Sequence, residues 1–185
     1  MQKVNIIEDF YDPVDFGLMT YQLNNTAMKG IYQPTNVFYP DRLQAYPVWE
    51  TDTFSVNSQA FNIFKNTFEK KTNLKIKEIN SFFRKIHRSE LEQSPYKGRE
   101  ESMVHQDDTD SAQLAGVVYF DSFSIKDGTR IYSYRDQIEP DLIVGSKPNR
   151  CVFYDPSLFH SAGIDWRRET RSLQIFFIRG INTND

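Results

Sequence analysis

The second half of the chain consists of short segments in which apolar and polar residues alternate. The first runs from Leu74 to His87, and others follow at about 99–106, 113–121, 129–134, 141–144, 150–154, 159–163 and 170–179. Turn-forming residues separate them, among them Asp127-Gly128 and Lys147-Pro148-Asn149. A period of two is typical of strands with one buried face. The pattern therefore predicts antiparallel sheets arranged as a sandwich or a barrel.

The first half of the chain favours helices. After a short strand at 3–7, Asp12 and Pro13 are suited to the N-cap and first position of a helix that runs to about Asn25. A second helix is predicted at 54–71, where phenylalanines recur at helical spacing and indicate a face packed on the core. Between them, residues 27–52 are predicted to form an irregular loop, either a lid or a surface wrap held by its aromatics.

Length and charge narrow the class of protein. The 185 residues are expected to form a single domain, with a helix-rich support at 1–73 and a β-rich core at 74–181. A net charge of −3 gives no support to nucleic-acid or anionic-membrane binding by bulk electrostatics. One cysteine, no signal-peptide pattern and no apolar run long enough to cross a membrane predict a cytoplasmic protein.

Two of the three histidines lie where a metal site can form. On a strand, His105 and Asp107 point to the same side, and His160 follows well downstream after an apolar strand and a turn. If the three converge, they present two nitrogens and one carboxylate on one face of an ion, as in non-heme Fe(II) oxygenases. The alternatives are a solvated strand end for His105 and Asp107, and a core histidine for His160.

Arg171 begins the apolar strand Arg-Ser-Leu-Gln-Ile-Phe-Phe-Ile. If its guanidinium faces inward, it requires an anionic partner, because an isolated buried charge is costly. A bound dicarboxylate would supply that partner through a bidentate contact. The alternative is an ordinary surface arginine at a strand start.

Together these elements resemble the 2-oxoglutarate- and Fe(II)-dependent dioxygenases, and most closely their prolyl-4-hydroxylase-like branch. The resemblance covers about residues 75–180. Its motifs are His105-x-Asp107, Asn149-Arg150-x-Val152, His160 and Arg171-Ser172-Leu173. It implies a mostly β (α+β) fold, a double-stranded β-helix or jelly-roll barrel with the N-terminal helices packed on one face.

The resemblance also assigns roles to individual residues. It implies that His105, Asp107 and His160 hold Fe(II), and that Arg171 binds the distal carboxylate of 2-oxoglutarate, with Arg168 as a lesser candidate. It places Tyr119 where many members carry a tyrosine that hydrogen-bonds the same carboxylate, although a core aromatic explains Tyr119 equally well. Where members usually have two glycines, this chain has Asp127-Gly128.

The implied activity is hydroxylation of a small-molecule or peptidyl substrate, with 2-oxoglutarate and O2 consumed. The resemblance favours a prolyl or other peptidyl or amino-acid group, but the fold does not decide among substrates. One alternative is a non-catalytic jelly-roll or cupin-like protein that binds a metal or ligand, and another is a cupin-like metal enzyme that needs no 2-oxoglutarate. Calcium is disfavoured, because the loop that follows His105 lacks the glycine and terminal glutamate of an EF-hand.

Overall fold

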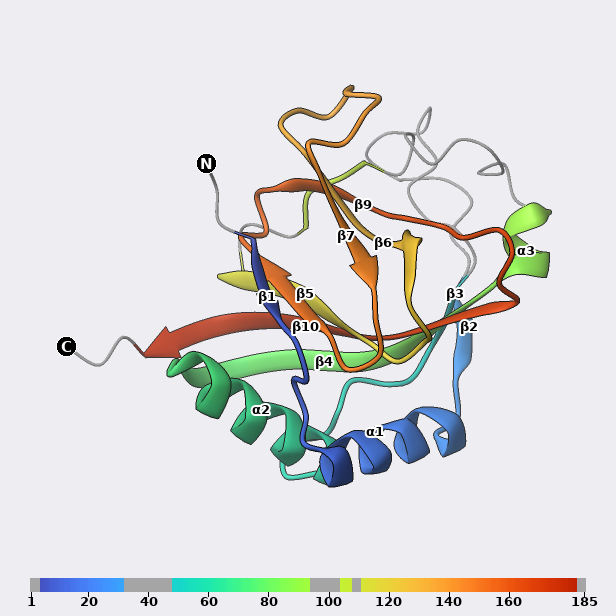
Figure 1. The fold of residues 1–185 in the computed structure, drawn as a ribbon. Coiled ribbons are helices and arrows are strands. Elements are labelled where there is room, and N and C mark those ends of the chain that lie inside the picture. The colour runs from blue at the N-terminus through green and yellow to red at the C-terminus, as the bar shows by residue number, and fades with distance from the viewer. Residues whose placement is uncertain (1–3, 32–47, 94–103, 108–110, 183–185) are drawn as a thin grey trace.

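The computed structural model describes residues 4–31, 48–93, 104–107 and 111–182, and these form two antiparallel sheets (Figure 1). The larger sheet has the order β1(Asn5–Ile7), β8(Cys151–Tyr154), β5(Leu114–Tyr119), β10(Thr170–Asn182), β4(Lys75–His87), β3(Val48–Glu50) and β2(Lys29–Ile31). The smaller sheet has the order β7(Leu142–Ser146), β6(Ser124–Tyr132) and β9(Phe159–Ala162). The predicted mostly β, jelly-roll class is confirmed.

Two helices cover one face of the larger sheet. α1(Pro13–Asn25) and α2(Gln59–Thr72) lie beneath it in Figure 1, while α3(Arg88–Glu92) follows β4 at one end. An aromatic cluster fills the space between the helices and the sheet. In it the rings of Phe64 and Phe176 lie 4.8 Å apart and those of Phe68 and Phe153 5.2 Å apart. This cluster explains the phenylalanine stripe of the second helix.

The opposite face of the larger sheet looks toward the smaller sheet. A second, mainly aliphatic cluster lies there, with Val117, Val152 and Leu173 from the larger sheet and Ile131 and Val144 from the smaller one. Successive side chains of β10 point alternately into the two clusters. Arg171 lies on the same face of the strand as Leu173 and Ile175. Arg171 therefore enters the space between the sheets.

The starts of both long helices follow from their caps. The Asp12 side chain accepts hydrogen bonds from the amides of Val14 and Asp15, which confirms the predicted N-cap. Ser58 caps α2 by accepting from the Phe61 amide, so that helix begins at Gln59 rather than near residue 54. The predicted start near residue 54 was wrong because the phenylalanine spacing continues on the N-terminal side of Ser58, the residue at which the helix begins.

Two other predictions need correction. The proposed irregular loop at 27–52 contains strands at both ends, where β2 pairs with β3 and β3 pairs with β4; residues 32–47 lie outside the described part. The predicted turn at Asp127-Gly128 lies inside β6, where the pairing with β7 shifts register between Ser124 and Thr129. Asp-Gly here forms an irregularity within a strand and not a chain reversal.

The predicted strand at 99–106 falls mostly outside the described residues, and its visible end is a single bridge at His105. In the described residues, no helix combines the length and apolar character needed to cross a bilayer.

Candidate metal centre

His105, Asp107 and His160 converge at the edge of the space between the sheets. Their ligand atoms all lie within 4.8 Å of one another. Nε2 of His160 is 3.4 Å from Oδ2 of Asp107, and Nε2 of His105 is 3.8 Å from Oδ1 of the same carboxylate. The proximity expected from the sequence is therefore present, and the role as metal ligands stays a prediction.

Backbone hydrogen bonds bring these three residues together. The amide of His105 donates to the carbonyl of His160 at 2.9 Å, and the amide of His160 donates to the carbonyl of His105 at 2.8 Å. The Asp107 amide donates to the carbonyl of Pro156 at 3.1 Å. The segment 104–107 thus lies along β9 in antiparallel fashion, and the two-residue spacing of His105 and Asp107 turns both side chains toward His160.

His160 is oriented by the main chain. Its Nδ1 lies 2.9 Å from the carbonyl oxygen of Leu158, a geometry in which Nδ1 carries the proton and Nε2 is left to bind a ligand. Burial lowers the pKa of the imidazole to about 4, against a smaller opposing effect of that carbonyl. The ring is therefore neutral at pH 7, as a metal ligand must be.

The donor set fits a divalent transition metal. Bonds of about 2.1 Å at right angles place neighbouring ligand atoms roughly 3 Å apart, so the 3.4 Å and 3.8 Å separations need only a small inward movement. Imidazole with carboxylate suits iron, and three ligands on one face leave further coordination positions open. The side chain of Asp107 is 15% exposed and that of His105 43% exposed, so the centre borders solvent on the His105 side.

A cavity of about 140 Å³ lies beside the three residues and continues between the sheets. His105, Asp107 and His160 line one part of it, and Arg171 and Thr129 line it as well. The other lining residues are Arg84, Gly116, Val117, Tyr154, Ser161, Ala162, Leu173, Ile175 and Phe177. One cavity is thus lined by both the candidate ligands and a buried guanidinium.

Arg171 is 6% exposed and faces inward as the sequence required for an anion-binding role. Its Nη2 donates to the carbonyl of Gly128 at 3.1 Å, and its Nε lies 3.1 Å from Oδ1 of Asp127. Arg168, the other arginine considered, lines a second, smaller cavity, which Arg171 also lines, and donates to the carbonyl of Phe123 at 2.7 Å. Of these two arginines, Arg171 is the one that lines the cavity of the histidines.

Tyr119 is fully buried next to Arg171. Its hydroxyl lies 2.6 Å from Oγ1 of Thr129, and the Arg171 guanidinium lies 5.8 Å from the centre of its ring. Burial raises the pKa of the Tyr119 phenol, so it keeps its proton. Tyr119 reaches the cavity wall through Thr129, whose hydroxyl was not singled out in the sequence. The signal for Thr129 was its place on the inward side of the strand that follows Asp127-Gly128.

Two lining residues of the cavity were missed, and Asp127, which contacts Arg171 and lines the smaller cavity, was given another role. Arg84 comes from β4 and donates from Nε to Glu50 of β3 at 2.6 Å. The ring of Tyr154 lies 4.8 Å from that of His160. Asp127 had been assigned to a turn, although an inward-facing arginine without a ligand calls for an acidic residue nearby. The third histidine, His87, ends β4 with its ring 6.3 Å from that of Trp49.

Comparison with solved structures shows which proteins share this architecture. A prolyl-4-hydroxylase from Pseudomonas putida aligns with a TM-score of 0.58 and 13% identity, covering 97% of this chain and 94% of the other. An oxidoreductase of the 2OG-Fe(II) oxygenase family from Burkholderia pseudomallei gives 0.60 and 7%, covering 96% and 84%. A prolyl hydroxylase from Trichoplax adhaerens, in complex with a peptide fragment of hypoxia inducible factor, gives 0.61 and 8%, covering 97% and 84%.

In sequence, no protein-family model and no curated protein matches the chain. At identities of 7–13%, the structural likeness establishes the fold and leaves activity to be argued from the site. The fold is the jelly roll of 2-oxoglutarate- and Fe(II)-dependent oxygenases, over nearly the whole length of the chain.

Proposed function

We propose that this chain is a 2-oxoglutarate- and Fe(II)-dependent oxygenase that hydroxylates a prolyl or other peptidyl or amino-acid group. The observation that carries the proposal is the shared cavity. Two imidazoles and a carboxylate within 4.8 Å of one another line one part of it, and the buried Arg171 lines another. A 2-oxo acid with a second carboxylate suits such a cavity, because its 2-oxo acid end can chelate the metal and its distal carboxylate can bind Arg171.

Each residue then has a defined task. His105, Asp107 and His160 would hold Fe(II), and Arg171 would bind the distal carboxylate, with the Thr129 hydroxyl beside it and Tyr119 behind Thr129. When bound, Fe(II) supplies the oxidising chemistry, in which 2-oxoglutarate and O2 give succinate, CO2 and a hydroxylated product. The apolar walls formed by Val117, Leu173 and other residues exclude water from that chemistry.

The structural neighbours support the substrate class. Two of the three described above are a prolyl-4-hydroxylase and a prolyl hydroxylase bound to a peptide fragment. The candidate centre borders solvent on its His105 side, which suits a substrate presented on a peptide. Incubation with proline-containing peptides and with free amino acids, followed by mass spectrometry for a gain of one oxygen atom, tests this class.

The primary test is succinate formation from 2-oxoglutarate by the purified protein with Fe(II) and O2. Turnover is expected in the wild type, including uncoupled turnover without substrate. Asp107→Ala should abolish it, and Arg171→Ala should raise the KM for 2-oxoglutarate. Asp52→Ala is the matched control, because this carboxylate is 82% exposed and pairs with the exposed Lys29. Absence of turnover together with absence of metal binding at His105 would refute the proposal.

We also propose that residues 1–73 support a catalytic core at 74–181 within one cytoplasmic domain. α1 and α2 on the outer face of the larger sheet support this division. The short strands β1, β2 and β3 extend that sheet from the N-terminal part, so the support is continuous with the core. A fragment beginning at residue 74 should therefore fail to fold, which circular dichroism would show.

A further inference from the structure

We infer that Asp127 is a specificity-determining residue of the co-substrate site: its carboxylate already neutralises Arg171, and so it lowers the affinity of the cavity for a second carboxylate. The inference rests on the proposed function, because it concerns how Arg171 meets the distal carboxylate of a 2-oxo acid. It assigns to Asp127 a role toward the ligand in addition to its place in the fold.

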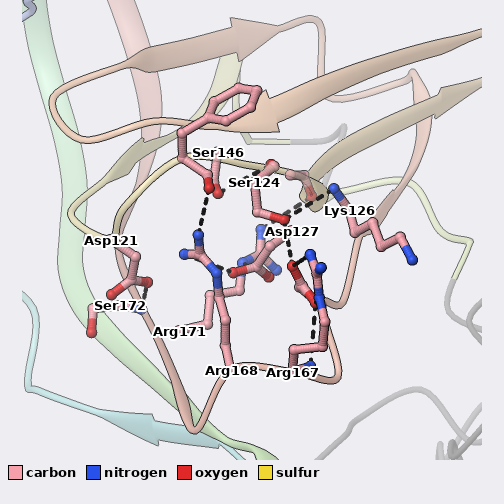
Figure 2. Close-up of polar contacts among 12 residues, drawn as sticks. Asp121, Ser124, Lys126, Asp127, Ser146, Arg167, Arg168, Arg171 and Ser172 are labelled. Carbon is pink, nitrogen blue, oxygen red and sulfur yellow. Dashed lines mark hydrogen bonds and ion pairs between the residues drawn. The ribbon is translucent and has the colours of Figure 1, made fainter.

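Asp127 and Arg171 form a buried ion pair. Asp127 is 2% exposed and Arg171 6% exposed, and Oδ1 of Asp127 lies 3.1 Å from Nε of Arg171. The neighbouring Gly128 carbonyl accepts from Nη2 of the same guanidinium at 3.1 Å. The irregular segment of β6 thus places a carboxylate and a carbonyl on two different nitrogens of Arg171 (Figure 2). A ligand in the cavity must bind the remaining edge of that group.

The surrounding charges are balanced before any ligand enters. Three carboxylates and three guanidinium groups interact here: Asp121, Asp127, Asp165, Arg167, Arg168 and Arg171. Figure 2 shows Asp121, Asp127, Arg167, Arg168 and Arg171. Nη1 of Arg168 lies 3.7 Å from Oδ2 of Asp127, and Arg167 pairs with Asp165 at 2.8 Å. Arg167 is 77% exposed and solvent screens its charge, so a further carboxylate on Arg171 would add a net negative charge to the buried part of this cluster, which is unfavourable.

Burial has the largest effect on the pKa of the Asp127 carboxyl. Burial raises the pKa of its carboxyl, and the lowering effects of Arg171 and Arg168 do not cancel that rise. The same carboxylate nevertheless holds the guanidinium in place, so the cavity is shaped for a second carboxylate but binds it weakly.

The test compares two 2-oxo acids in calorimetric titrations of the full-length protein loaded with Mn(II). One is 2-oxoglutarate and the other is 2-oxobutanoate, which lacks the distal carboxylate. Asp127→Asn keeps the size of the side chain and an oxygen that can accept from Arg171, but it removes the charge. We expect Asp127→Asn to bind 2-oxoglutarate about tenfold more tightly, because a like charge near the ligand is gone. Its affinity for 2-oxobutanoate should stay within about twofold, because that ligand carries no charge to this position.

Asp52→Asn is the control. Asp52 is 82% exposed and pairs with Lys29, outside the cluster around Asp127, so neither affinity should change in this variant. Asp127→Ser, a smaller neutral replacement, should give the same result as Asn and can be used if the Asn variant does not fold.

The outcomes separate the two proposals. If the wild type binds 2-oxoglutarate and forms succinate, but neither neutral variant gains affinity for it, the role of Asp127 is refuted and the proposed function stands. An equal gain for both 2-oxo acids would also refute it, because the effect would then come from loosened packing. If no form of the protein binds 2-oxoglutarate, the proposed function itself fails.

Discussion

Adding a methyl group at Gly128 should destabilise the fold strongly. A Cβ built there would lie 1.9 Å from the carbonyl oxygen of Val144 and 2.7 Å from Cα of Gly145. Carbon and oxygen in contact are normally about 3.3 Å apart, so β6 and β7 would have to separate by about 1.4 Å. Both atoms belong to the backbone of β7, so no side chain can rotate away. The irregular segment of β6 therefore requires glycine at this position.

The expected cost of Gly128→Ala lies at the upper end for overpacking, about 3 kcal/mol of unfolding free energy. For a domain of this size, that corresponds to a melting temperature lower by roughly 6–12 °C. Thermal unfolding followed by circular dichroism measures it. Affinity for 2-oxoglutarate should also fall, because the Gly128 carbonyl that accepts from Arg171 would move.

Gly17→Ala is the matched control for this prediction. Gly17 lies in α1, and a Cβ there would meet nothing within 4 Å. Alanine in an exposed helix is more favourable than glycine by about 0.5–1 kcal/mol, so this variant should be more stable than the wild type. The same Gly→Ala change should thus lower the stability at position 128 and raise it at position 17. A Gly128→Ala variant that melts within about 2 °C of the wild type would refute the account of β6.

Three more predictions concern the site. Mn(II) at about a hundred times its Kd should stabilise the wild type by about 2.7 kcal/mol, and Asp107→Ala should remove this shift in a thermal melt. Tyr119→Phe should cost about 1 kcal/mol of stability in urea unfolding, because Thr129 loses its buried partner at 2.6 Å, and a stability equal to wild type would contradict that bond. The hydrogen bonds from Arg167 hold the pKa of Asp165 well below its usual range, more than offsetting the effect of burial. A lowered folded-state pKa stabilises the fold above the unfolded-state value of about 3.9 and is lost as pH falls further. In the Asp165→Asn variant, the unfolding free energy should therefore fall less steeply as pH decreases. Urea unfolding at a series of pH values from roughly 6 to 2 measures this.

The sequence was informative where a residue type and a period acted together. Alternation from Leu74 onward predicted most of the strands, and the two-residue spacing of His105 and Asp107 predicted that both would face the same way. The remote His160 could be joined to them because few histidines compete for the role in this chain. These inferences depend on local geometry, which a strand fixes.

What the sequence did not reveal depends on pairings between distant strands. Asp127-Gly128 has the composition of a turn, and only the pairing of Ser124 and Thr129, on either side of it, with β7 makes it part of β6. The partner of Arg171 was correctly expected to be an anion, but a protein carboxylate was not considered for it. The ends of the 27–52 segment are strands because β4 offers an edge to β3, a long-range pairing that overrides a loop-like composition.

The pairing of β6 with β9 connects the two parts of the cavity. Ile131 of β6 is paired with His160, and Thr129 is paired with Ala162, so the strand that carries a candidate metal ligand is in register with the strand that carries the Arg171 contacts. The Gly163 amide donates to the Gly128 carbonyl at 2.7 Å and extends this pairing to the irregular segment. A displacement of β6 therefore cannot move Asp127 alone, because β9 and its bridge to His105 are bonded to the same strand. It follows that a disturbance at Gly128 should weaken metal binding as well as 2-oxoglutarate binding, whereas removal of the Asp127 charge should affect only the latter.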